Sequence, residues 1–267
     1  ILRCLVGSEM CIRDSIMSTQ DTDISPFDTG AYASRQSFVT GTAVRHCAEI
    51  LRDKILAYAK TLLPEIDTTE LELRDNWIWA GKEQAISLAA LAEESYYSLT
   101  NSSVLTAEVS EQVKKNTIAT GCCFAEVEVD LKLGKIKILH IINVHDSGKL
   151  INPQLAEMQV QGGMFMGMGY GISEQLILDE KTGRPLNGNL LDYKMMTMLD
   201  TPEIKVDFVE LNDPIGPYGN KALGEPPAIP CAPAIRNAVL HATGVAFNEN
   251  PLTPQRLIDG FQKAGLI

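Results

Sequence analysis

The stretch FAEVEVDLKLGKIKILHIINVHDSG, residues 124–148, carries the clearest structural signal in the chain. Apolar and polar side chains alternate on both sides of Leu133-Gly134. This alternation is typical of two antiparallel strands joined by a tight turn, because successive side chains of a strand point to opposite faces. We therefore predict an antiparallel strand pair here.

The segments on either side of this strand pair mix helical and extended patterns. Helices are predicted for residues 42–65, 86–98, 152–176, 232–244 and 251–262, strands for 203–211, and hairpins for 68–81 and 175–186. The two hairpins turn at Asp75-Asn76 and near Thr182-Gly183. Because helices and strands do not alternate as regular βαβ units, the sequence predicts an α+β fold with mixed or antiparallel sheets and packed helices.

Composition argues against several kinds of partner and site. A net charge of −11 and a pI near 4.9 argue against nucleic-acid binding, which needs clustered Lys and Arg. No apolar run reaches the roughly 18 residues of a membrane span. Six cysteines without regular spacing and without CxxC indicate reduced thiols in a cytoplasmic protein. Four scattered histidines predict no metal site built from side chains.

The first 15 residues, ILRCLVGSEMCIRDS, differ in style from everything that follows them. The part LVGSEMCIRDS resembles the translated end of an adapter used to make sequencing libraries. We interpret residues 1–15 as such a scar, and residues 16–267 as one domain that is a fragment of a larger subunit.

The stretch GEPP, residues 224–227, places Glu225 between a glycine and two prolines. Proline disfavours helical backbone in the residue before it, and Gly224 permits a close approach that a side chain would prevent. This pattern allows two interpretations: a carboxylate held in one direction, or a stiff connection whose glutamate points into water. The local pattern by itself favours the second, since most loop charges are solvated.

Two further stretches are unusual. TGAYASRQS, residues 29–37, combines small residues, hydroxyls and an arginine just before a predicted helix, which suits either anion binding or ordinary helix capping. EMQVQGG, residues 157–163, places Gln159 and Gln161 in an otherwise apolar segment, where a buried amide needs a backbone or ligand partner. GMGYG, residues 167–171, does not fit a dinucleotide-binding motif and favours closely packed helix glycines.

Taken together, these stretches resemble the molybdenum hydroxylases, the xanthine dehydrogenase and aldehyde oxidase family. The resemblance rests on DTDISPFDTGAYASRQSFVTGTAV, INPQLAEMQVQGGMFMGMGYGISEQL and GNKALGEPPAIPCAPAIRNAV, in this order. It covers nearly all of residues 16–267 and corresponds to the C-terminal half of the molybdopterin-binding domain, most similar to bacterial xanthine dehydrogenase.

The resemblance implies a reaction and a set of site residues. It implies a hydroxylase that inserts a water-derived oxygen at an electron-poor carbon of a purine such as xanthine or hypoxanthine, with Glu225 as general base. It implies that the pterin and its phosphate are bound by Gly30, Ala31, Tyr32, Ala33, Ser34, Arg35 and Gln159. No side chain is expected to ligate molybdenum, because the pterin holds the metal in this family.

The resemblance also implies partners that this chain lacks. The first half of the molybdenum domain, the FAD and the [2Fe-2S] clusters are expected on other segments or subunits, in an oligomer. The molybdopterin is expected in its cytosine dinucleotide form. The fragment alone is expected to be inactive and to expose apolar surface where the other half belongs.

Two alternatives remain open at this stage. One is the same chemistry on an aldehyde, nicotinate or another N-heteroaromatic compound. The other is a non-catalytic half-domain with a binding or assembly role, in which GEPP is a structural turn.

Overall fold

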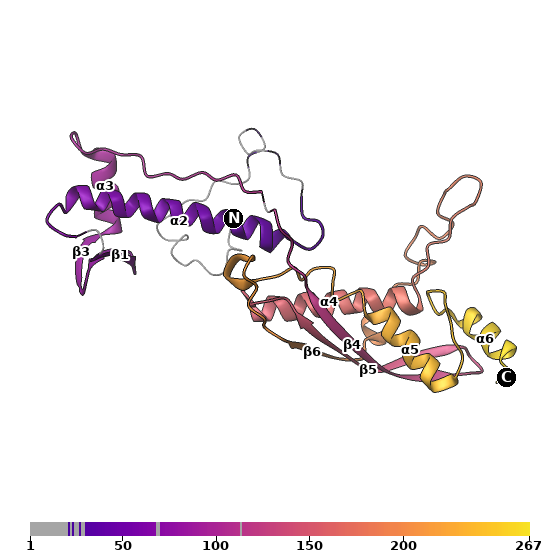
Figure 1. The fold of residues 1–267 in the computed structure, drawn as a ribbon. Helices are drawn as coiled ribbons and strands as arrows, with labels where there is room; N and C mark the ends of the chain where they lie inside the picture. The colour runs from indigo at the N-terminus through magenta and orange to yellow at the C-terminus, as the bar shows by residue number, and fades with distance from the viewer. Residues whose placement is uncertain (1–20, 22, 24–26, 28–29, 68–69, 113) are drawn as a thin grey trace. The chain divides into compact units, whose positions relative to one another are not determined.

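The computed structural model describes residues 21, 23, 27, 30–67, 70–112 and 114–267 (Figure 1). The proposed adapter scar at residues 1–15 lies outside them. The described residues divide into two compact units: residues 40–67 and 70–112 belong to the first, and residues 30–39 and 114–267 to the second. No helix in the described part of the chain is long and apolar enough to cross a membrane.

The first unit packs two helices against a small antiparallel sheet. Its elements are most of α2 (Gln36–Leu62), β1 (Leu71–Arg74), β2 (Trp77–Ala80), β3 (Glu83–Ser87) and α3 (Leu88–Tyr97). The predicted hairpin turn is confirmed, since Asp75 and Asn76 both adopt positive φ, as a two-residue hairpin turn requires. The third strand β3 was not predicted. The buried core contains Ile55, Tyr58, Ala59, Leu71, Ile78 and Leu91.

The centre of the second unit is the strand pair predicted from residues 124–148. Strands β4 (Thr120–Asp130) and β5 (Lys135–Asp146) pair antiparallel, and β6 (Glu203–Phe208) adds to β5 in parallel. Gly134 in the turn has a φ of +59°, and a Cβ there would overlap the carbonyl oxygen of Pro254. This turn therefore requires glycine.

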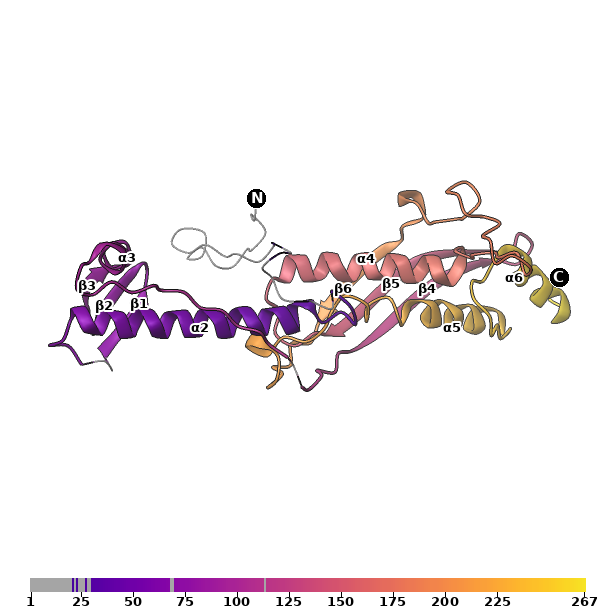
Figure 2. The same ribbon diagram turned by 90° about the horizontal axis from the view of Figure 1, so that it is seen from above.

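Two helices cover one face of this sheet. Helix α4 (Pro153–Ile172) contacts β5 and β6, and α5 (Cys231–Thr243) contacts β4, so that the helices lie side by side (Figure 2). Asn152 caps α4 by accepting a hydrogen bond from the backbone of Leu155 at 3.0 Å. The sheet and both helices bury one core of Ile138, Ile141, Val160, Met164, Met168, Met196, Cys231 and Ile235.

The C-terminal part of the second unit forms a second hydrophobic core. Helix α5 ends at Gly244, whose φ of +74° is typical of a C-terminal cap, and α6 (Pro254–Lys263) follows. Two short 3-10 turns, η2 (Met198–Asp200) and η3 (Pro217–Gly219), complete the elements of this unit. The second core contains Val239, Phe247, Leu252, Leu257 and Phe261.

The predicted hairpin at residues 175–186 is reduced to one isolated bridge between Leu178 and Pro185. The backbone N–H groups of Asp179 and Leu186 donate to the carbonyl oxygens of Arg184 and Ile177, at 2.8 Å each, on either side of this bridge. Next to them, the side chain of Asn187 bonds the backbone of Gln175 and Ile177, where further pairs of the ladder would form. With its small sheets and packed helices, the chain has the α+β fold that the sequence predicts.

Candidate functional site

Two of the predicted site residues meet directly, although 191 positions separate them. The Ser34 hydroxyl donates to Oε2 of Glu225 at 2.8 Å, and the backbone N–H of Glu225 donates to the Ser34 hydroxyl oxygen at 2.5 Å. A Cβ on Gly224 would lie 3.1 Å from that oxygen, a tight approach. The glycine before Glu225 therefore lets the two segments come together.

The loop that carries Ser34 has an unusual backbone. Ala33 and Ser34 are non-glycine residues with φ values of 49° and 56°, and Gly30 has a φ of 85°. The positive φ costs on the order of 1–3 kcal/mol at each of the two non-glycine residues, and such residues cluster at functional sites. The loop leads directly into α2 at Gln36. The N-terminal backbone N–H groups of a helix are suited to binding anions.

Tyr32 and Arg35 lie against each other in the same loop. The guanidinium of Arg35 stacks over the Tyr32 ring at 4.5 Å from its centroid and also donates to the Tyr32 hydroxyl. This contact orders the arginine beside Ser34. Tyr32 itself is about half exposed.

Gln159 on α4 also contacts the segment that carries Glu225. Its Nε2 donates to the carbonyl oxygen of Gly224 across 3.4 Å, so it contacts the residue directly before Glu225. Gln161 instead donates to Glu157, one turn earlier on the same helix, at 3.1 Å. Only one of the two glutamines therefore reaches the site.

The expectation of buried amides at these positions is wrong for Gln159, which is exposed. Ala156, Val160, Met164 and Met168 turn toward the core, whereas Gln159 lies one turn before Gly163, on the side of the helix that meets the Glu225 turn. An exposed amide beside Glu225 remains accessible to a polar ligand.

The turn that carries Glu225 is seated on α4. The carbonyl oxygen of Glu225 accepts a hydrogen bond from Ala228 at 3.0 Å. A Cβ on Gly163 would lie 3.1 Å from the side chain of Pro227, and one on Gly167 would overlap the carbonyl oxygen of Ala228. The prediction of closely packed helix glycines is thus confirmed, and their partner is this turn. Glu225 itself is exposed.

Polar side chains are buried beneath this turn, and sequence reasoning missed them. Asn143 and His145 occupy inward positions of β5 that continue the row begun by Ile141. Asn143 donates to the carbonyl oxygen of Pro227 at 3.1 Å. Polar residues at inward positions of an otherwise apolar strand were the signal that could have identified them.

A buried ion pair lies next to these residues. Lys221 and Asp146 contact each other at 2.6 Å, and the Asp146 carboxylate also accepts from the backbone of Gly148 at 2.9 Å. Burial opposes ionisation of Asp146, but the hydrogen bonds from Lys221 and Gly148 outweigh it and hold the pKa of Asp146 below its ordinary value. Lys221, which begins the segment leading to Glu225, is therefore anchored to the end of β5.

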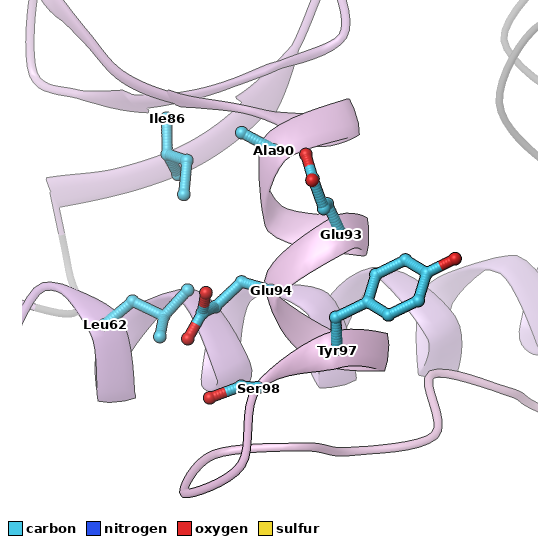
Figure 3. Close-up of a pocket in the computed structure, with 7 residues that line it drawn as sticks. All are labelled: Leu62, Ile86, Ala90, Glu93, Glu94, Tyr97 and Ser98. Carbon is cyan, nitrogen blue, oxygen red and sulfur yellow. The ribbon is translucent and has the colours of Figure 1, made fainter.

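A cavity of about 540 Å³ opens elsewhere, in the first unit. Its walls come from α2, β3 and α3, with Glu93, Glu94 and Tyr97 at its rim (Figure 3). None of the predicted site residues lines it. The meeting of Ser34, Gln159 and Glu225 is instead an open surface of the second unit.

The chemistry at this surface fits a polar organic group. Within the described ranges, no three His, Cys, Asp or Glu side chains lie where they could hold a metal ion together. The groups present around Glu225 are a hydroxyl, an amide and backbone N–H donors. A metal held by its own organic ligand can be bound by such neutral groups, whereas a bare ion needs several strong ligands.

Comparison with known proteins identifies the family. Residues 13–202 match the molybdopterin cofactor-binding domain family. The chain is 48% identical over 254 residues to the xanthine dehydrogenase molybdenum-binding subunit of Escherichia coli O157:H7, an alignment that covers 94% of this chain and 34% of that subunit. It is 33% identical over 152 residues to the aldehyde oxidoreductase molybdenum-binding subunit PaoC of Escherichia coli K12, covering 57% of this chain and 20% of that one.

Solved structures give the same result. CO dehydrogenase from Oligotropha carboxidovorans superposes with a TM-score of 0.82 at 26% identity, over 92% of this chain and 31% of that chain. Quinoline 2-oxidoreductase from Pseudomonas putida 86 superposes with a TM-score of 0.78 at 26% identity, over 90% of this chain and 32% of that chain. The chain spans about a third of the length of the curated xanthine dehydrogenase subunits that it matches. It belongs to the molybdopterin cofactor-binding domain family of the molybdenum hydroxylases.

Proposed function

We propose that this chain forms the second half of the molybdopterin-binding domain of a hydroxylase that inserts a water-derived oxygen at an electron-poor carbon of a purine such as xanthine or hypoxanthine. The observation that carries the proposal is the meeting of Ser34, Gln159 and Glu225 from three distant segments. Each of these residues resembles a site residue of the family, and separate structural roles would not require them to share one place.

The proposed cofactor is molybdenum held by molybdopterin in its cytosine dinucleotide form. When bound, this group supplies the two-electron redox chemistry of the reaction. The positive-φ backbone at Ala33 and Ser34, ahead of α2, supports a role in holding the phosphate. The residues assigned to the cofactor are Gly30, Ala31, Tyr32, Ala33, Ser34, Arg35 and Gln159.

Glu225 is assigned the role of general base. A base must be held in one direction and still be able to accept a proton. Its backbone N–H and one carboxylate oxygen are both engaged by Ser34, which fixes the direction of the side chain. A carboxylate has two oxygens with about four acceptor positions, so the Ser34 contact leaves capacity for the transferred proton.

Similarity supports a purine substrate over an aldehyde. Identity is 48% over 254 residues to the xanthine dehydrogenase subunit and 33% over 152 residues to the aldehyde oxidoreductase subunit. Both relatives are named as molybdenum-binding subunits, which supports transfer of electrons to separate [2Fe-2S] and FAD subunits in an oligomer. The described cysteines are free thiols, which supports a cytoplasmic location.

The test is Glu225→Gln in the assembled, cofactor-loaded protein that carries this chain. The amide keeps the shape and can still accept from Ser34, but it is not a base. We expect kcat on xanthine to fall by about 10²–10⁴-fold with bound molybdenum unchanged. Glu180→Gln, an exposed position near a remote turn, is the control and should leave both unchanged. Near-normal turnover in Glu225→Gln would leave GEPP as a structural turn.

A further inference from the structure

The carbonyl oxygen of Pro227, two residues after Glu225, accepts hydrogen bonds from two separate elements. Asn143 on β5 donates its Nδ2 at 3.1 Å, and the thiol of Cys231 at the start of α5 donates at 3.3 Å. Both donors are fully buried. The turn that carries Glu225 is therefore held from beneath as well as through Ser34.

Asn143 is a costly residue at this position. Within the described residues its Oδ1 is buried without a hydrogen-bond partner. An unpaired buried acceptor carries a desolvation penalty that an aliphatic side chain of similar size avoids. Unlike an aliphatic residue, Asn143 supplies an N–H donor to the carbonyl oxygen of Pro227.

The position of this contact links it to Glu225. Pro226 and Pro227 each have a φ restricted by the ring, which removes two of the backbone rotations between Glu225 and the Pro227 carbonyl and makes this connection stiff. On the other side the turn rests against Gly163 and Gly167 of α4, where side chains would collide with it. The helix glycines and the hydrogen bonds from Asn143 and Cys231 thus confine the turn together.

We infer that Asn143 is a positioning residue for Glu225, acting through the Pro227 carbonyl. This inference rests on the proposed role of Glu225 as base. Asn143 lies on β5, the central strand between β4 and β6, so its position is fixed by hydrogen bonds on both sides of the strand. Through its hydrogen bond to Pro227, Asn143 holds the exposed turn in a fixed position on the sheet. In this arrangement Ser34 fixes the carboxylate and Asn143 fixes the backbone beneath it.

The test is Asn143→Leu in the assembled, cofactor-loaded protein. It removes the donor together with the unpaired oxygen, so the thermal midpoint should stay the same or rise. Exchange of the amide protons of Ala228 and Ile229, which close the turn, should become roughly two- to tenfold faster, the effect of one lost hydrogen bond on local opening. We expect kcat to fall by about tenfold or more with little change in KM, because the base is misplaced in the loaded site.

Ile141→Val is the matched control, since Ile141 is buried on the same face of the same strand and its side chain has no hydrogen-bond donor to offer the turn. It should lower the thermal midpoint and leave both the exchange of Ala228 and kcat unchanged. Asn143→Asp provides a rescue, because a carboxyl donates to Pro227 only when protonated. After correction for the chemical exchange rate, the protection of its turn amides relative to the wild type at the same pH should be greater at low pH than at high pH.

The inference would be overturned if the amides of Ala228 and Ile229 exchanged in Asn143→Leu as slowly as they do in the wild type. Faster exchange with unchanged kcat would overturn it as well, and so would a loss of kcat in Ile141→Val as large as in Asn143→Leu. If Asn143→Leu fails to fold, a pH dependence of this exchange in Asn143→Asp that does not differ from that of the wild type would also overturn it. The exchange measurement does not depend on the reaction, so it stands apart from the Glu225→Gln test of the proposed function.

Discussion

The ammonium group of Lys221 and the carboxylate of Asp146 lie 2.6 Å apart, and only 10% and 7% of their side chains are exposed. The pair fastens the segment that leads to Glu225 onto the end of β5. Next to it in the chain, His145 is also buried, and neither ring nitrogen has a hydrogen-bond partner in the described part of the chain. Both features make the stability of the second unit depend on pH.

His145 should lower stability first as the pH falls. Burial lowers the pKa of His145 from its ordinary value of 6.5, while the nearby Asp146 carboxylate opposes this change less strongly. The unfolded chain therefore binds a proton at higher pH than the folded chain does, so stability falls as the pH drops below about 6.5. Urea unfolding between pH 7 and pH 5 measures this. A His145→Gln variant should flatten the slope, and an unchanged slope would exclude His145 as its source.

Asp146 should act at lower pH. Its folded pKa lies below the ordinary value of 3.8, because its hydrogen bonds outweigh burial. The stability that it contributes is therefore complete above the unfolded pKa and is lost as the pH falls through the folded value. A second loss of stability should appear below about pH 4 in the same experiment. It should persist in His145→Gln, which separates the two groups.

Ser34 should be needed to orient Glu225. Ser34→Ala removes both hydrogen bonds to Glu225, and we expect kcat to fall by about tenfold or more with molybdenum loading measured alongside. Ser34→Gly lacks the same hydroxyl, but glycine adopts positive φ without strain. The Ser34→Gly protein should therefore be more stable than Ser34→Ala by about 0.5–1 kcal/mol. Steady-state kinetics and thermal unfolding of the two variants separate orientation from backbone strain. Equal kcat in wild type and both variants would contradict the orienting role.

Gln159 should matter for cofactor content more than for folding. Gln159 is exposed and makes one long hydrogen bond, so Gln159→Ala should lower bound molybdenum while the thermal midpoint of the cofactor-free protein changes little. Metal analysis and thermal unfolding measure these two quantities. Gln161→Ala is the control on the same helix, because Gln161 contacts Glu157 and not the Glu225 turn. Equal loading in all three proteins would make Gln159 a purely structural residue.

The glycines of α4 provide a matched pair for the packing of the Glu225 turn. A methyl group on Gly167 would overlap the carbonyl oxygen of Ala228, whereas one on Gly162 would meet nothing within 4 Å. Gly167→Ala should therefore destabilise the protein by about 1–3 kcal/mol. Gly162→Ala should stabilise it by about 0.5–1 kcal/mol, because alanine is the better helix former. Denaturant unfolding compares them, and a stable Gly167→Ala would mean that the turn is not held against α4.

Much of the local structure could be predicted because it depends on neighbouring residues. The antiparallel pair of β4 and β5 and the Asp75-Asn76 turn follow from alternation and turn chemistry within a few positions. The hairpin at residues 175–186 is shorter than predicted, because the side chain of Asn187 takes the backbone groups of Gln175 and Ile177 that would extend its ladder. The predicted single domain and the adapter scar remain predictions.

The sequence by itself determined most of the segments that form helices and strands, though not β3, and a resemblance pointed to Ser34, Gln159 and Glu225 one at a time. Only the tertiary structure decided that these residues meet, that β6 pairs parallel to β5, and that Asn143 lies under the Glu225 turn. Helix α4 is apolar and rich in glycine on most sides, so its periodicity could not indicate that Gln159 faces outward. Contacts across 191 residues depend on how the sheet and helices pack, which no local pattern encodes.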